Sequence, residues 1–246
     1  MGTVVVITSG KGGTGKTSLT GGVAVALAEM GKTVLCIDAD IGLRNLDISL
    51  GMTDTVLMDF TDVMEGRCSL SRAVAGHPGI PNLYLLTAPL SYSRESILKV
   101  GFKALLDEAR QQYDYILIDC AAGLGFGFQL ASCSAEEAIV VSMNDFSALR
   151  DAQRVVSQLA PSIPSIRLVV NRVQPKLFRR LGATVDDVMD AVGLPLLGVV
   201  PEDAQVILAS NAGRALLQTS SKRAAKAYRN IAKRLTGEQI PLMKIR

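Results

Sequence analysis

Residues 10–17 carry the clearest chemical signal in the chain. They read Gly-Lys-Gly-Gly-Thr-Gly-Lys-Thr and fit the pattern GxxxxGK[ST], which is typical of loops that bind phosphate groups. Glycines let backbone N–H groups turn toward phosphate oxygens, and the N-terminus of a following helix favours anions. A glycine-rich turn with a chance lysine is the alternative, but a predicted strand precedes this pattern and a predicted helix follows it. The residues expected to bind phosphate are Gly12, Gly13, Thr14, Gly15, Lys16, Thr17 and Ser18.

The two lysines of this loop have different expected roles. Lys16 should reach the β- and γ-phosphates of a nucleoside triphosphate, and the Thr17 hydroxyl should bind Mg²⁺. The pattern does not require a lysine at the position of Lys11. Two lysines in one short loop repel each other, which costs free energy unless a bound group supplies further negative charge. We therefore treat Lys11, like Lys16, as a candidate for the chemistry.

Three carboxylates follow predicted strands. Asp38 and Asp40 come after the apolar run 34–37, and Asp119 comes after the apolar run 116–118. In open parallel sheets ligands bind outside the carboxyl ends of the strands. Carboxylates would repel a triphosphate unless they bind Mg²⁺ or hold an attacking water. We therefore assign Asp38 and Asp119 to Mg²⁺ and Asp40 to the water. The alternative is that these carboxylates cap loops.

The positions of strands and helices support this placement. Strands are expected at 4–8, 33–37, 83–87, 115–118, 138–141, 167–170 and 196–200, and helices at 17–30, 97–112, 148–159, 185–192 and 221–235. Their alternation predicts an α/β fold, a single-domain P-loop NTPase with a mostly parallel twisted sheet and helices on both faces. We expect this domain to cover residues 1–236, with residues 237–246 as a tail. Residues 40–81 form the most irregular part, and His77 within them is expected to be a loop residue.

Composition excludes several classes of protein. The chain has 246 residues, of which 48% are hydrophobic and 20% charged, and this is too apolar for a disordered chain. No apolar run reaches the roughly 18 residues that a membrane-spanning helix needs. The four cysteines show no CxxC spacing and no signal peptide precedes the first strand, so we expect reduced thiols and an intracellular protein.

The end of the chain is basic. Residues 222–246 carry eight Lys/Arg and a single acid, Glu238. Such a charge suggests either an anionic partner, a membrane or nucleic acid, or simply the solvated face of a helix. Apolar residues at helical spacing in 222–235 favour the outer face of a core helix. Only 240–246 then remains as a weak or truncated membrane-targeting segment, since Pro241 breaks a helix there.

The form GKGGTGKT resembles the deviant Walker A loop of the MinD/ParA family of P-loop ATPases, and resemblance extends over nearly the whole chain. The stretches 38–47, 59–63 and 198–203 are similar to the branch of that family that places the division septum. The resemblance implies Mg²⁺-dependent ATP hydrolysis, ATP-driven dimerisation, and a Lys11 that reaches the partner's nucleotide. It also implies an acidic interface residue at Asp145. The adenine contacts that it implies are Asn171, Arg172, Pro201, Glu202 and Asp203.

The same resemblance implies partners and a location. The partners are a homodimer with ATP, a MinC-like division inhibitor, an activator such as MinE, and an anionic membrane surface; nucleic acid is not expected. The protein would be cytoplasmic and peripheral at the inner face of the cell membrane. The helix from Arg150 onward would form part of the partner-binding face. One departure concerns 120–123, which read Cys-Ala-Ala-Gly where the family commonly has Ser-Pro-Ala-Gly. Without the proline, the expected switch at 119–125, in which Gly123 N–H meets the γ-phosphate, is less rigid.

Other functions of related ATPases remain open at this point. A DNA-partitioning ParA-type protein would bind duplex DNA in a salt-sensitive manner, and a regulator of flagellar number would share nearly all motifs. A carrier of metal clusters would need cysteines that bridge a dimer, and Cys120 and Cys133 show no such pattern. A synthetase or kinase would need a second substrate pocket, of which the sequence gives no sign.

Overall fold

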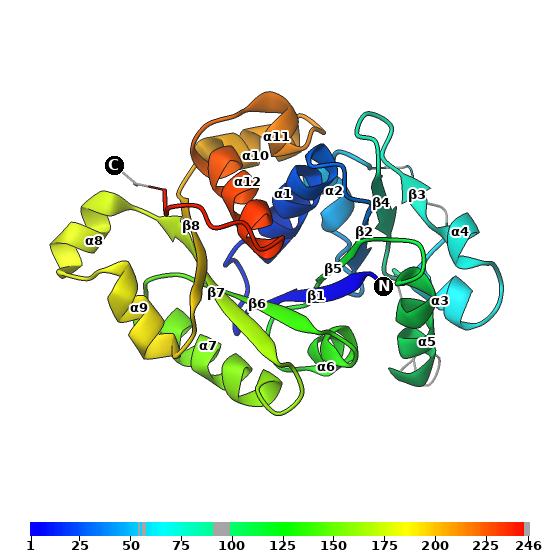
Figure 1. Cartoon of the computed structure of the whole chain (residues 1–246), viewed down its shortest axis with the longest axis horizontal. Coiled ribbons are helices and arrows are strands. Elements are labelled where there is room, and N and C mark those ends of the chain that lie inside the picture. Colours follow the sequence, from blue (N-terminus) through cyan, green and yellow to red (C-terminus); the bar gives the residue numbers. More distant parts are fainter. Residues whose placement is uncertain (54, 56–57, 91–98, 244–246) are drawn as a thin grey trace.

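An eight-stranded sheet forms the centre of the molecule (Figure 1). The computed structural model describes residues 1–53, 55, 58–90 and 99–243. The strands are β1 (Thr3–Thr8), β2 (Val34–Asp38), β3 (Ala75–Gly76), β4 (Leu83–Leu86), β5 (Tyr115–Asp119), β6 (Glu137–Ser142), β7 (Ser165–Val173) and β8 (Leu196–Pro201). They lie in the order β3-β4-β2-β5-β1-β6-β7-β8, and every pair is parallel except β3 with β4. The predicted mostly parallel sheet is confirmed.

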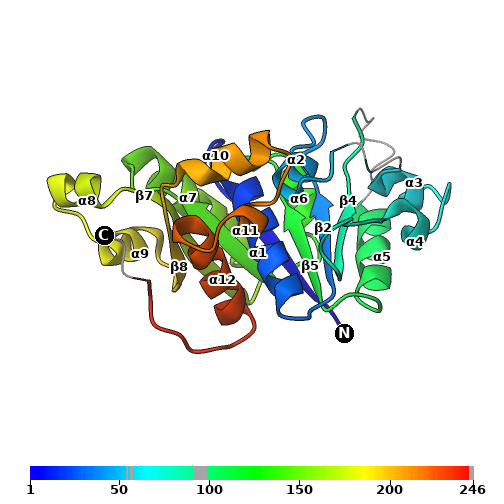
Figure 2. The ribbon, with the colours of Figure 1, turned by 90° about the horizontal axis from the view of Figure 1, so that it is seen from above.

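Helices cover both faces of this sheet (Figure 1), and Figure 2 looks onto one of these faces. They are α1 (Lys16–Glu29), α2 (Leu46–Leu50), α3 (Phe60–Met64), α4 (Leu70–Ala73), α5 (Lys99–Ala109), α6 (Phe126–Ser132), α7 (Phe146–Leu159), α8 (Pro175–Leu181), α9 (Val185–Val192), α10 (Ala204–Asn211), α11 (Leu216–Thr219) and α12 (Arg223–Leu235). One apolar cluster lies under α1, α2, α10, α11 and α12, and a second lies under α3–α9. The single-domain α/β fold with a three-layer arrangement is therefore as predicted.

Strand β1 shows why the sheet is buried on both sides. Val4 and Val6 belong to one apolar cluster, whereas Val5 and Ile7 belong to the other. Side chains alternate across a strand, so a continuous β-branched run serves both layers at once. Because β1 pairs with β5 and β6 on either side, the loop that follows it leaves from the middle of the sheet.

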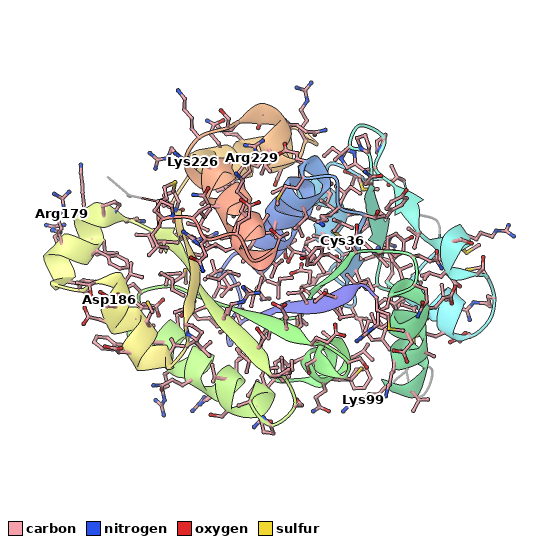
Figure 3. All side chains as sticks on the ribbon, in the orientation of Figure 1. Cys36, Lys99, Arg179, Asp186, Lys226 and Arg229 are labelled. Carbon is pink, nitrogen blue, oxygen red and sulfur yellow. The ribbon has the colours of Figure 1, made fainter. Side chains whose placement is uncertain are left out.

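The basic helix α12 packs on the sheet, as its apolar spacing predicted. Its buried residues are Ala224, Ala225, Ala227, Tyr228, Ile231, Ala232 and Leu235. Several of its cations serve the fold itself. Arg229 forms two hydrogen bonds with the Glu29 carboxylate at 2.7 and 2.8 Å, and Arg234 Nη1 donates to the carbonyl of Leu197 at 2.9 Å. Figure 3 places Lys226 and Arg229 on this helix.

Sequence patterns missed the short elements. The expected irregular segment 40–81 contains α2, α3, α4 and the antiparallel strand β3, and α6, α8, α10 and α11 were also not predicted. Helix α3 is held by a capping box in which Asp59 accepts from Thr61 N while Asp62 accepts from Asp59 N. Such four- to eight-residue helices carry too little apolar periodicity to be recognised. His77 does lie in a loop, where its Nε2 contacts the carbonyl of Leu50 at 2.9 Å.

Two predicted segments extend beyond the described residues. Positions 97 and 98 of the expected helix 97–112, and positions 244–246 of the expected tail, lie outside them. The described tail, 237–243, contains neither helix nor strand, and Met243 packs against the cluster under α12. Among the described residues, no helix combines the length and apolar character that crossing a bilayer requires.

The contact between α1 and α12 yields a prediction on stability. A Cβ atom at Gly22 would lie 2.0 Å from Cδ2 of Tyr228, a buried aromatic ring that cannot move aside easily. Gly22→Ala should therefore lower the free energy of unfolding by about 1–3 kcal/mol, as overpacked cores do. Urea denaturation measures this. As a control, Gly101→Ala in α5 meets only the flexible end of Met64, at 3.1 Å, and should be neutral or stabilising. Equal effects of the two substitutions would contradict the argument.

Candidate nucleotide site

The phosphate loop joins β1 to α1 and is shaped by its glycines. Gly13 and Gly15 have φ angles of +78° and +88°, the left-handed region that favours glycine. A Cβ atom at Gly15 would lie 2.3 Å from Nδ2 of Asn171, whereas Gly12 and Gly13 face open space. Gly10 is packed against α7, because a Cβ atom there would lie 2.4 Å from Cβ of Asp151. The loop is thus fixed at both ends and open in the middle, where backbone N–H groups can meet phosphate oxygens.

Lys16 is buried inside this loop. Its Nζ donates to Ser9 Oγ at 3.0 Å, and the Ser9 hydroxyl in turn donates to the carbonyl of Lys11 at 2.7 Å. The buried hydroxyl of Thr14 has no hydrogen-bond partner within the described part of the chain. A buried unpartnered hydroxyl in a loop of this shape is suited to a phosphate oxygen. Ser9 was not among the predicted site residues, although its position directly before the motif could have indicated it.

Asp38 and Asp119 lie side by side. They are paired in register at the carboxyl ends of β2 and β5, and both are buried. Burial, followed by the charge of Asp38, raises the pKa of Asp119 to about 7. Burial also raises the pKa of Asp38 to about 6, although backbone N–H groups oppose this. Two adjacent carboxylates with raised pKa values form a site that favours a cation.

The donor set at Asp119 fits Mg²⁺. The carboxylate accepts hydrogen bonds from the side chains of Thr17 and Thr20, so a hydroxyl and a carboxylate oxygen already lie together. Mg²⁺ prefers oxygen ligands, takes few of them from protein and keeps several waters. The described residues contain no group of three or more His, Cys, Asp or Glu side chains that could enclose a metal. Thr17 and Asp119 would hold the ion, with Asp38 beside them.

Asp38 also caps the loop that follows it, which the sequence offered as the alternative role of these carboxylates. Its two carboxylate oxygens accept the backbone N–H groups of Asp40, at 2.9 Å, and Leu46, at 3.0 Å. Asp38 therefore anchors the segment that carries Asp40. Asp40 itself is half-buried, and its pKa is raised by burial while the charge of Lys16 opposes the shift. The Asp40 carboxylate is therefore within range of the charge of the loop lysine.

The segment after β5 contacts the beginning of the phosphate loop. Gly123, with a φ angle of +82°, donates its N–H to the carbonyl of Ser9 at 3.2 Å. That this N–H meets a γ-phosphate when nucleotide is bound stays a prediction. A Cβ atom at Gly127 would lie 3.1 Å from Cβ of Ala121, so the residue that replaces the family's proline is packed against α6. The segment 119–125 is in direct hydrogen-bond contact with the loop that it was expected to sense.

Lys11 lies outside the interior of the loop. Its Nζ contacts both carboxylate oxygens of Asp145, at 2.9 and 3.1 Å. Asp145 also caps α7 by accepting the N–H of Ala148 at 2.9 Å. Burial disfavours the charged form of Asp145, but the hydrogen bonds from Lys11 and Ala148 outweigh it and lower the pKa. The sequence indicated an acidic interface residue here but not its ion pair with the loop.

The expected adenine side lies next to the loop, across Gly15. Asn171 Nδ2 donates to the carbonyl of Thr14 at 2.7 Å, and Arg172 takes a φ angle of +53°. One small pocket brings all five predicted residues together with Gly15 and Ser18. It is lined by Gly15, Ser18, Asn171, Arg172, Val200, Pro201, Glu202, Asp203, Val206, Ile207 and Tyr228. The Asp203 carboxylate caps α10 and accepts the N–H of Ala224, so it also has a structural role.

The raised pKa of Asp119 predicts how stability depends on pH. Since the folded state holds this proton up to about pH 7 and the unfolded state releases it near pH 4, stability should fall between those values and then level off. Asp119→Asn should remove much of this loss and raise the free energy of unfolding at pH 8 by about 1–3 kcal/mol, while Mg²⁺-dependent nucleotide affinity is lost. Urea denaturation in metal-free buffer at pH 4 and pH 8 measures the first effect. A variant that is less stable than the parent chain at pH 8 would contradict this assignment.

Comparison with known proteins extends these observations. The family described as the CobQ/CobB/MinD/ParA nucleotide binding domain matches residues 5–217. The septum site-determining protein MinD of Synechocystis sp. is 39% identical over 99% of this chain and 92% of its own length. MinD of Bacillus subtilis is 40% identical over 98% of this chain and 92% of its own length.

Solved structures agree with these relatives. The MinC:MinD cell division protein complex of Aquifex aeolicus has a chain that is 36% identical, with a TM-score of 0.88 and 98% of both chains covered. MinD from Pyrococcus horikoshii, complexed with Mg-ADP, is 31% identical, with a TM-score of 0.84 and 96% of both chains covered. A ParA family ATPase from Chlorobium tepidum, at 23% identity, shares the fold. The phosphate loop, the paired carboxylates and these similarities lead to one conclusion: the chain belongs to the MinD/ParA family of nucleotide-binding ATPases, in its septum site-determining MinD group.

Proposed function

We propose that this chain is an ATP-hydrolysing switch that dimerises with ATP, binds a membrane and a division inhibitor in that state, and releases both after hydrolysis. It would thereby regulate where the division septum forms. The observation that carries the proposal is the different placement of the two loop lysines. Lys16 is buried within its own loop, while Lys11 is held by Asp145, with 29% of its side chain exposed.

The surroundings of Lys11 support a second copy as partner. A partly exposed ion pair contributes little to stability, so its presence at the loop is better explained by function. Large apolar side chains follow three strands at the same edge of the sheet: Leu43 is 67% exposed, Leu124 38% and Phe146 93%. Exposed apolar side chains around a charged site are typical of protein–protein contact surfaces. A second copy on this edge would bury them and bring its own Lys11 toward the nucleotide.

The remaining site residues have roles in hydrolysis. Lys16 would neutralise charge that develops on the transferred phosphoryl group, and the loop N–H groups would position it. Asp40 would accept a hydrogen bond from the attacking water. Mg²⁺ bound by Thr17 and Asp119, with Asp38 beside them, would shield the negative charge of the β- and γ-phosphates.

The hydrogen bonds of the site supply a route from nucleotide to surface. Asp38 holds the segment 40–46 through two backbone N–H groups, and Gly123 holds the segment after β5 to Ser9. A nucleotide or cation that binds to Asp38 or to the loop would compete with these hydrogen bonds. Both segments carry an exposed leucine, Leu43 or Leu124, so their positions would decide whether a second copy can dock.

The proposed partners follow from the group to which the chain belongs. A relative from Aquifex aeolicus is known in complex with MinC, which supports a MinC-like inhibitor for this chain. A MinE-like activator would stimulate hydrolysis. The tail would contact an anionic bilayer, with the protein in the cytoplasm and peripheral at the inner face of the cell membrane.

ATP-dependent dimerisation tests the proposal. In the hydrolysis-slowed variant Asp40→Ala, ATP with Mg²⁺ should double the mass that light scattering measures after gel filtration. Adding Lys11→Ala should return the protein to a monomer, because the trans contact to phosphate is lost. Lys103→Ala, on an exposed position of α5, is the matched control and should leave the dimer intact. A chain that stays monomeric with ATP and Mg²⁺, or a dimer indifferent to Lys11, would refute the proposed switch.

A further inference from the structure

Helix α8 presents apolar side chains to solvent among positive charges. Leu177 and Leu181 are 45% and 58% exposed, and their spacing of four places them on one face of the helix. Lys176, Arg179 and Arg180 are exposed as well. None of the three forms a salt bridge to any residue that the structure describes, and Arg179 Nε donates to the carbonyl of Pro175 within the same helix. Packing of the domain explains Phe178, which is buried, but not the two leucines.

The C-terminal tail leads to the same place. Arg234 donates to the carbonyl of Ile240 from Nε at 3.3 Å and from Nη2 at 3.0 Å, which directs the chain past β8. Leu242 and Met243 then line a cavity of about 570 Å³ together with Phe178 and Arg179. Leu242 is 52% exposed. Figures 1 and 2 both show the described part of the tail, up to residue 243, leading toward α8 and α9.

The exposed residues of α8 and of the adjoining tail are together called the α8–tail surface. They are Lys176, Leu177, Arg179, Arg180, Leu181 and Leu242, of which Arg179 and Leu242 line the same cavity. The acids nearest to it begin α9. The Asp187 carboxylate accepts hydrogen bonds from the backbone N–H and the hydroxyl of Thr184. Asp186 lines the cavity together with Arg179, and both residues are labelled in Figure 3. Asp186 offsets part of the charge of Arg179, so Lys176 and Arg180 give the surface its positive character.

We propose that the α8–tail surface contacts the anionic lipid bilayer. Leu177, Leu181 and Leu242 would enter the headgroup region, while Lys176, Arg179 and Arg180 would pair with lipid phosphates. Surfaces that lie in a membrane interface combine these two features, and each Lys or Arg adds attraction to anionic lipid. A nucleic acid backbone would use the cations but gain nothing from the three exposed leucines. The inference rests on the proposed membrane association and adds a folded element to the tail as its site.

Vesicle sedimentation of the full chain with ATP and Mg²⁺ tests this inference. Vesicles with phosphatidylglycerol should bind the chain, and pure phosphatidylcholine vesicles should bind it much less. Arg179→Gln with Arg180→Gln should weaken binding more than tenfold, since each cation near an anionic surface contributes about fivefold. Leu177→Gln with Leu181→Gln should weaken it without changing net charge. The charge-matched control, Arg72→Gln with Lys103→Gln, removes two exposed cations on α4 and α5, at the other end of the sheet, and should have little effect (Figure 1).

Fluorescence gives a second readout that does not depend on affinity. The chain contains no tryptophan, so a single introduced tryptophan reports its own surroundings. Leu181→Trp should shift its emission to shorter wavelength when phosphatidylglycerol vesicles are added. Val100→Trp, at a position of α5 that is 80% exposed, should not shift. Unchanged thermal melting of each variant excludes misfolding as a cause.

The outcomes separate this inference from the proposed function. If vesicles bind in an ATP-dependent manner but the α8 variants and the Leu181→Trp emission behave like their controls, the surface is wrong and the membrane switch stands. If ATP dimerises the chain but no form binds vesicles, the membrane surface is refuted while the dimer stands. If the arginine pair instead governs binding to duplex DNA and not to vesicles, the surface belongs to nucleic acid.

Discussion

Two buried carboxylates, Asp38 and Asp119, side by side at the carboxyl ends of adjacent parallel strands, determine most of the site. Burial at this place raises both pKa values. Ionising the two carboxyl groups therefore costs free energy, which a bound cation would offset. The folded chain tolerates this because backbone N–H groups and threonine hydroxyls surround them. The same hydrogen bonds connect the two carboxylates to the segment 40–46 and to α1. The charge state of the pair therefore acts on both of these parts of the molecule.

The sequence could predict those parts of the fold that depend on long, regular patterns. The strand 4–8 was recognisable because its β-branched residues serve two apolar layers, and α12 because seven buried side chains recur at helical spacing. Short helices could not be predicted, since α3 exists through the reciprocal hydrogen bonds of Asp59 and Asp62 rather than through apolar periodicity. The antiparallel strand β3 comprises only Ala75 and Gly76, which is too short for any pattern.

The candidate site divides along the same line. Lys16, Thr17 and Asp119 follow from a motif and from the ends of two strands, because local chemistry fixes both. The ion pair of Lys11 with Asp145 and the hydrogen bond of Lys16 with Ser9 join residues through the fold or within a turn, and only geometry shows them. At the basic end of the chain, the sequence signal is strong but the geometry shows a different role for it. Its charge is prominent in the sequence, yet Arg229 and Arg234 hold the fold together through Glu29 and Leu197.

The close approach of Gly10 to Asp151 has a mechanical consequence. With backbone and side-chain atoms of α7 only about 2.5 Å from where a Cβ would stand, the beginning of the phosphate loop has no clearance on that side. A shift of the loop toward α7 must be taken up by the helix as a whole. Asp151 is the sixth of the 14 residues of α7, so about 12 Å of helix separate it from Leu159, and a tilt of about 5° at Asp151 would move that end by about 1 Å. The contact between positions 10 and 151 therefore couples any movement of the loop toward α7 to a movement of that helix.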